Sequence, residues 1–180
     1  LALIALALWI RWGRQGRIGL RTIVFVPVSC LLWLAHSAGW GLFGLVAFAT
    51  EVVRMRRTGI GWIGSALRAS LFSATLTLPL MPMFLTATPG NPLLWDWKAK
   101  ASWLPALLRE RWKWYDVASA VLLFSILWMA VRNRCFRFDP LAGTAALITL
   151  AAFVWMPRLA AGGAYVDMRM LAPGIALALV

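Results

Sequence analysis

Residues 117–131 read VASAVLLFSILWMAV, and residues 141–157 read LAGTAALITLAAFVWMP. Neither stretch contains a charged side chain, and as a helix each would be apolar nearly all round rather than along one face. Such a helix lies either in the core of a large protein or in lipid. A chain of 180 residues is too small to bury several of them. These two stretches therefore predict a membrane protein.

The composition of the whole chain supports the same prediction. Hydrophobic residues make up 62% of the chain and charged residues 13%, whereas a soluble domain has about 45–50% and about 25%. Lipid is the solvent that accepts the surplus apolar surface. A net charge of +12 would suggest nucleic acid in a soluble protein. Here the cations lie between apolar runs, so we expect a lipid bilayer as partner, with contacts to anionic head groups, and no nucleic acid.

Seven apolar segments follow one another along the chain. Backbone polar groups in hydrocarbon need internal partners, so we expect helices, and the alternation typical of barrel strands is not visible. The predicted fold class is all-α, a polytopic transmembrane helix bundle that forms one domain over 1–180. The outermost segments are too short to cross a membrane, so we expect a fragment of a longer protein. The segments are 1–10, 19–36, 39–54, 60–86, 117–131, 141–157 and 171–180.

The stretch 22–50 allows one span or two. As one helix it would exceed 40 Å at about 1.5 Å per residue, which is longer than the hydrocarbon layer is thick. Its middle reads HSAGWG over 36–41, a plausible turn. We favour two short spans. The choice decides on which side of the membrane residues 87–116 lie, and the distribution of Lys and Arg between the loops does not settle it.

Segment 94–114 differs from the spans around it. Five of the twelve Trp residues of the chain occur here, interleaved with Lys and Arg, and its apolar residues recur at helical spacing. Trp and snorkelling Lys side chains favour the head-group region, so we expect an amphipathic helical segment in the membrane plane. Asp96 and Lys100 are spaced for an i,i+4 pair. The segment is a simple anchoring belt, a surface where Lys98 or Lys100, with Asp96, contacts a phosphorylated lipid, or a surface for contacts with another partner.

The string Tyr165 to Pro173 reads YVDMRMLAP and opens the last apolar run. An Asp and an Arg at the mouth of a membrane helix are costly unless they are paired or solvated. On a helix Tyr165 and Arg169 would share a face, whereas Asp167 and Arg169 would not. One interpretation is interfacial anchoring, with Asp167 favoured at a helix start. The other is a site in which Arg169 holds a phosphate, because guanidinium suits phosphate geometry.

Metal chemistry has no support in the sequence. His36 is the single histidine, Cys30 and Cys135 are isolated, and no Cys or carboxylate lies at ligand spacing from the histidine. Glu51 and Arg54 are expected to form a local ion pair of little energetic value. We therefore predict no metal site and no evident cofactor, except for a divalent metal ion if residues beyond this chain carry an acidic site.

The planar Trp/Lys segment and the D-x-R-x-L-x-P pattern of Asp167 to Pro173 resemble bacterial GT-C type membrane glycosyltransferases, over roughly residues 94–180. The resemblance implies a multi-pass protein of the bacterial cytoplasmic (inner) membrane that uses a polyprenyl-phosphate-linked sugar. The acidic catalytic residue of that family lies in an early outer loop, so it is expected outside this chain. The residues that then become candidates for substrate or phosphate contacts are Asp96, Lys98, Lys100, Tyr165, Asp167 and Arg169.

Two other functions stay open. A transporter or flippase subunit would place ionisable residues near the membrane midplane, whereas most charges here lie at the edges of predicted loops. A non-catalytic integral membrane protein would tolerate exchange of Asp167 and Arg169 with little effect beyond stability.

Overall fold

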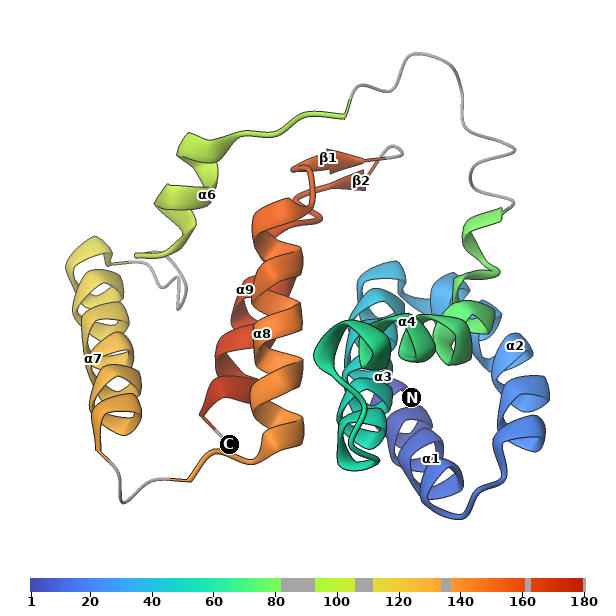
Figure 1. Ribbon diagram of the computed structural model, residues 1–180. Coiled ribbons are helices and arrows are strands. Elements are labelled where there is room, and N and C mark those ends of the chain that lie inside the picture. The colour runs from blue at the N-terminus through green and yellow to red at the C-terminus, as the bar shows by residue number, and fades with distance from the viewer. Residues whose placement is uncertain (82–92, 106–111, 134–136, 161–162, 180) are drawn as a thin grey trace. The chain divides into compact units, whose positions relative to one another are not determined.

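The computed structural model describes residues 1–81, 93–105, 112–133, 137–160 and 163–179 (Figure 1). The chain forms two compact units, Leu1–Gly90 and Asn91–Val180, and each is described by itself. Both are helical, which confirms the predicted secondary structure. The β-structure among the described residues consists of one hairpin with strands of two residues and one isolated bridge.

The first unit contains four α-helices and one 3₁₀ turn among its described residues. Its elements are α1 (Ala2–Arg14), α2 (Ile18–Ala35), α3 (Ser37–Arg57), α4 (Trp62–Ser73) and η1 (Ala74–Thr77).

The helices α2 and α3 form an antiparallel hairpin that breaks at His36. This residue has an extended backbone (φ −168°, ψ 100°), and its Nδ1 accepts a hydrogen bond from the Gly39 amide at 3.1 Å. Residues on the two sides of the break lie together: Phe25 stacks on Phe43 with ring centroids 5.9 Å apart, and Arg21 and Glu51, each 15 residues from His36, form an ion pair. The stretch 22–50 therefore forms two helices, as predicted.

Aromatic rings form the core of this unit. The Trp9 ring stands perpendicular to Phe25 at 5.0 Å and to Phe43 at 6.3 Å, and Trp9 has no exposed surface. The outer face of α2 is apolar as well, since Ile23 is 73% exposed and Leu34 is 72% exposed. Apolar side chains thus lie both inside the unit and on its surface.

The predicted span 60–86 is not one helix. The helix α4 has 12 residues, about 18 Å at 1.5 Å per residue, and this is too short to cross about 30 Å of hydrocarbon. It tightens into η1, and the Leu76 carbonyl accepts hydrogen bonds from Ser29 Oγ at 2.8 Å and from Trp40 Nε1 at 3.1 Å. Side chains of α2 and α3 therefore satisfy a carbonyl near the point where the helix ends.

The second unit is built around the antiparallel pair α8 and α9. A Cβ atom at Gly174 on α9 would lie 2.9 Å from Leu150 Cδ2 on α8, so the two helices approach closely at this glycine. The elements are α6 (Trp97–Trp103), α7 (Lys113–Arg132), α8 (Pro140–Trp155), β1 (Leu159–Ala160), β2 (Gly163–Ala164) and α9 (Met168–Ala178).

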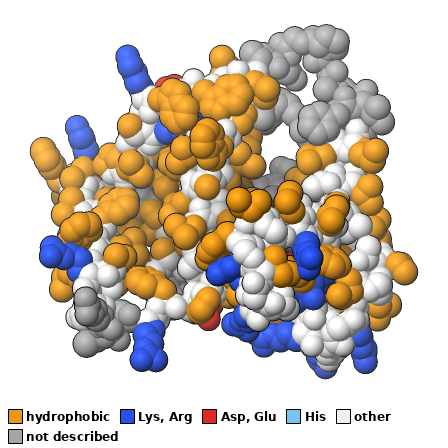
Figure 2. Space-filling model, in the orientation of Figure 1, with side chains coloured by type: hydrophobic (Ala, Val, Ile, Leu, Met, Phe, Trp, Pro, Cys, Tyr) orange, Lys and Arg blue, Asp and Glu red, His pale blue; other side chains and the backbone are white. Residues whose placement is uncertain are grey.

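Within the described residues, three helices are long and apolar enough to cross a membrane: α2, α3 and α7. The helices α8 and α9 are apolar but shorter. Large apolar side chains such as Leu122 and Trp128 on α7 are each 63% exposed. Figure 2 shows apolar side chains spread over the visible face of the protein. The three helices fit a membrane-associated protein.

Candidate functional site

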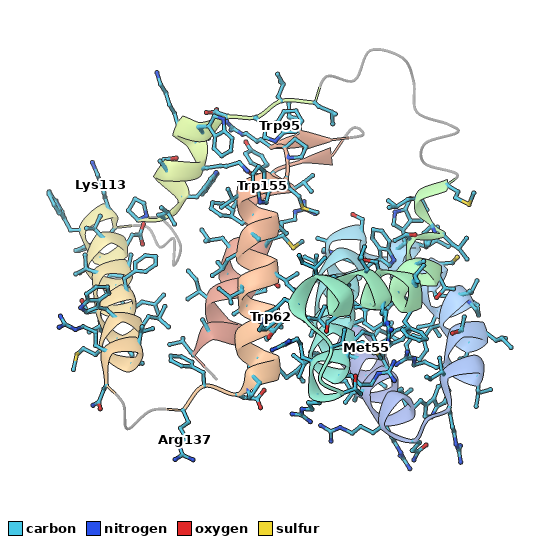
Figure 3. The ribbon with its side chains drawn as sticks, viewed as in Figure 1. Met55, Trp62, Trp95, Lys113, Arg137 and Trp155 are labelled. Carbon is cyan, nitrogen blue, oxygen red and sulfur yellow. The ribbon has the colours of Figure 1, made fainter. Side chains whose placement is uncertain are left out.

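The segment around α6 lies against the connection between α8 and α9. Leu94 pairs with Leu159 as an isolated antiparallel bridge, and the Leu94 carbonyl also accepts from the Arg158 amide at 2.8 Å. Trp95 Nε1 donates to the Trp155 carbonyl at 3.0 Å, and Figure 3 labels both residues. Two stretches about 60 residues apart in sequence are thereby joined.

Lys100 completes this contact at the C-terminal end of α8. Its Nζ donates to the carbonyls of Phe153 (2.6 Å), Val154 (2.8 Å) and Met156 (2.6 Å). The last four carbonyls of a helix have no partner within the helix. Together with Trp95, which reaches Trp155, Lys100 supplies a donor to each carbonyl from residue 153 to residue 156. The α6 segment therefore caps α8.

Asp167 lies beside the Lys100 ammonium. Asp167 has no exposed surface, Lys100 is 4% exposed, and Asp167 Oδ2 is 3.6 Å from Lys100 Nζ. Asp167 Oδ1 accepts from the Met168 amide at 2.8 Å, at the positive N-terminus of α9. Among the described residues Oδ2 has no hydrogen-bond partner. The negative charge of Asp167 offsets the buried charge of Lys100. Lys100 on α6 therefore joins the start of α9, through this ion pair, to the end of α8, through its hydrogen bonds to the carbonyls.

Asp96 is the N-cap of α6. Its Oδ1 accepts from the Ala99 amide at 2.9 Å, and its Oδ2 accepts from Arg158 Nη1 at 2.7 Å. The amide hydrogen bond first, and Arg158 after it, hold the pKa of the Asp96 carboxyl below its usual value. The predicted Asp96–Lys100 pair is wrong, because Asp96 turns to its own helix start while Lys100 reaches the carbonyls of α8.

Tyr165 lies between the hairpin and α9 with a positive φ of 59°. Its ring stands perpendicular to Trp103 at 6.1 Å, and the Arg158 guanidinium lies 5.1 Å from its centroid. Because Tyr165 precedes α9, it does not share a helical face with Arg169, contrary to the expectation from spacing.

The structure thus gathers four of the six predicted site residues, namely Asp96, Lys100, Tyr165 and Asp167. Lys98 on α6 and Arg169 on α9 are exposed. Arg158 was not predicted from the sequence, because its partner Asp96 lies 62 residues away and no local spacing indicates the pair. The ammonium of Lys100 has three hydrogens and donates to three carbonyls. Within the described part of the α6 segment and of the connection to α9, Lys98, Arg158 and Arg169 are therefore the accessible cations.

A second buried charge cluster lies in the first unit. Arg21 Nη1 donates to Glu51 Oε1 at 2.6 Å, and both side chains are almost completely buried. Arg54 contacts the other oxygen of Glu51 through its Nε at 2.9 Å. The predicted Glu51–Arg54 pair is therefore confirmed, but the buried partner Arg21, 30 residues away, was missed.

Among the described residues, no three His, Cys, Asp or Glu side chains come together as metal ligands would. Comparison of the chain with protein-family models, with curated proteins and with solved structures found no match.

Proposed function

We propose that this chain is part of a multi-pass integral membrane protein. The support is the combination of three helices of suitable length with large apolar side chains on their outer faces. Contact of these apolar side chains with lipid is favourable, whereas their contact with water is unfavourable.

Extraction from membranes tests this proposal. The chain should stay in the membrane pellet after alkaline carbonate treatment and should need detergent to remain monodisperse. Monodisperse behaviour without detergent would contradict it.

We further propose that the protein acts on a polyprenyl-phosphate-linked sugar, as the membrane glycosyltransferases that it resembles do, in a bacterial cytoplasmic membrane. One observation carries this proposal. The two stretches that bear the resemblance, the Trp/Lys segment and the Tyr165–Pro173 string, contact each other through Lys100–Asp167 and Trp103–Tyr165. They form one surface rather than two unrelated loops.

The residues of this surface divide into two roles. Lys100, Asp167 and Asp96 position the backbone, because their polar atoms already face protein partners. Arg169 and Lys98 are exposed, and we assign to them the contact with the donor phosphate. Tyr165, which is 43% exposed, offers a ring and a hydroxyl for a sugar.

The proposed reaction is glycosyl transfer. The bond between the anomeric carbon and the phosphate oxygen breaks, and a bond from the acceptor oxygen to that carbon forms. The acceptor proton passes to a base that we expect outside this chain, and the polyprenyl phosphate leaves with the electron pair. Cations beside the phosphate stabilise its developing charge.

Substitution of Arg169 tests the assignment. In the full-length protein, Arg169→Ala should lower turnover of a polyprenyl-linked sugar by about 100-fold or more, since it removes a donor to the leaving phosphate. Arg132→Ala on α7 removes an exposed cation elsewhere and should leave turnover unchanged. Equal turnover by both variants would remove Arg169 from the site.

A transporter is the second candidate, and the Arg21–Glu51 pair favours it. Fully buried ionisable residues in apolar helices often mark an ion or substrate pathway. Substrate uptake into proteoliposomes that is lost in Glu51→Gln, without sugar turnover by the unmodified protein, would favour this candidate over the transferase.

A further inference from the structure

One end of the α1–α2–α3 bundle is covered by arginine side chains. Residues 1–90 contain eight Arg and a single acidic residue, Glu51. The ends of the three helices meet at Gly13, Arg21 and Glu51, because a Cβ at Gly13 would lie 2.7 Å from Arg21 Nη1 and 3.8 Å from Glu51 Oε1. We name this region the arginine end. Its exposed cations are Arg11, Arg14, Arg17 and Arg57.

The charge of these exposed arginines is not balanced within the unit. Glu51 is 1% exposed and already binds Arg21 and Arg54. Arg56 donates to the Ile60 carbonyl at 2.7 Å and lies over the Trp62 ring. The arginine end therefore presents four exposed guanidinium groups to its surroundings and no exposed carboxylate.

The start of α2 adds positive charge at the same place. Its N-cap is Arg17, its first turn contains no acidic residue, and no side chain of the described residues caps its amides. A helix N-terminus carries a partial positive charge that acidic groups or anions normally balance. Arg21 follows one helical turn after Arg17, and its Nε and Nη2 are buried without a hydrogen-bond partner among the described residues. An anion would relieve this accumulation of positive charge.

We propose that the arginine end binds the phosphate head groups of anionic phospholipids. The apolar side chains of α2 beside the cations decide between lipid and other phosphates. Leu20 is 48% exposed and Ile23 is 73% exposed, one to two turns from Arg17. An anionic lipid supplies both a phosphate for the arginines and acyl chains for these side chains, whereas RNA or free phosphate supplies the phosphate alone. The inference rests on the proposed membrane location but not on the proposed sugar chemistry.

Lipid binding can be measured on the full chain in detergent by native mass spectrometry, with phosphatidylglycerol and phosphatidylcholine as competing probes. The patch variant carries R11Q, R14Q, R17Q and R57Q. The control variant carries R68Q, K113Q, R132Q and R137Q, which removes the same charge from exposed positions outside the arginine end. The preference for phosphatidylglycerol should fall about tenfold or more in the patch variant and less than twofold in the control.

The unmodified protein provides a test that does not depend on how the variants fold. Its bound phosphatidylglycerol should dissociate as NaCl rises from about 0.05 M to about 0.5 M, because screening weakens contacts between exposed charges. An equal loss of preference in both variants would overturn the proposal. So would displacement of the lipid by inorganic phosphate or by an RNA oligonucleotide at equal phosphate concentration. Sugar turnover is not part of the readout, so failure here is separate from failure of the transferase proposal.

Discussion

At the residue scale, Lys100 carries the largest expected energetic effect. Lys100→Met keeps most of the side-chain volume but removes the donor to three carbonyls and leaves Asp167 as a buried charge without a cation. Removal of one partner from a buried ion pair typically costs about 3–5 kcal/mol. We expect a loss of this size in the free energy of unfolding, measured by denaturant titration in detergent.

The neighbouring residue Lys98 provides the control for this prediction. It lies on the same helix but is exposed, so Lys98→Met should change the free energy of unfolding by no more than about 0.5 kcal/mol. The double variant Lys100→Met/Asp167→Asn should be less destabilised than the sum of its single changes, because the unpaired charge is removed. Equal effects of Lys98→Met and Lys100→Met would show that the cap contributes nothing.

Asp96 should make stability depend on pH in the acid range. Its pKa is lowered in the folded state by the Ala99 amide and by Arg158. The folded state therefore binds a proton less readily than the unfolded chain, whose carboxyl has a pKa of 3.8. The contribution of the carboxylate is complete above that value and is lost as the pH falls through the lower pKa of the folded state.

The measurement for Asp96 compares the unmodified protein with Asp96→Asn. The difference in stability between them should be constant from pH 7 to pH 5 and should shrink below pH 4. The side chain is 42% exposed, so the effect should be smaller than that of Lys100. A difference that grows as the pH falls would contradict the assigned direction of the pKa shift.

At the scale of elements, the close approach of α8 and α9 depends on Gly174. A Cβ there would lie 2.9 Å from Leu150 Cδ2 and 3.4 Å from the Leu150 backbone nitrogen. Gly174→Ala should therefore destabilise the second unit by about 1–3 kcal/mol through overpacking. Gly143→Ala on α8 is the matched control, because nothing lies within 4 Å of its Cβ. That change should stabilise the helix by about 0.4–1 kcal/mol, and thermal unfolding in detergent measures both.

The helices that are determined by neighbouring residues could be predicted from the sequence. The apolar runs 19–36 and 117–131 predict α2 and α7 closely, and the turn residues after Ala35 predict the break at His36. The end of α4 was not predictable in this way. Pro79 and Pro82 predict a bend late in this segment, but residues 71–78, LFSATLTL, contain no glycine or proline that would end the helix at Ser73. The contacts of the Leu76 carbonyl come from Ser29 and Trp40, more than 30 residues away.

The candidate site shows the same division between local and distant causes. The spacing and residue types selected Asp96, Lys100, Tyr165 and Asp167, and the structure gathers them. Spacing and residue types did not indicate their partners, because Lys100 reaches carbonyls 53 to 56 residues away. Backbone carbonyls have no signature in the residue types, so the capping of α8 by the α6 segment required the structure.

At the scale of the whole molecule, the arrangement of α2 and α3 makes a prediction about the two sides of the membrane. The helix α2 has 18 residues, about 27 Å at 1.5 Å per residue, which is close to the hydrocarbon thickness of about 30 Å. If both helices cross, Gln15 and Thr58 emerge on one side and Ser37 emerges on the other. The arginine end lies on the same side as Gln15 and Thr58, so this side should be cytoplasmic.

Cysteine labelling of intact cells and of inverted vesicles checks this orientation. In a background with Cys30 and Cys135 replaced by Ala, an impermeant maleimide should label Gln15→Cys and Thr58→Cys in inverted vesicles and Ser37→Cys in intact cells. The three positions are exposed, so accessibility should depend on the side of the membrane rather than on burial in the protein. Labelling of all three positions from one side would show that the hairpin does not cross, and the assignment of the arginine end to the cytoplasmic leaflet would then lose its basis. The side on which each position is labelled matters more than the labelling yield, because Lys and Arg near helix ends bias the orientation of a hairpin toward a cytoplasmic location of these residues.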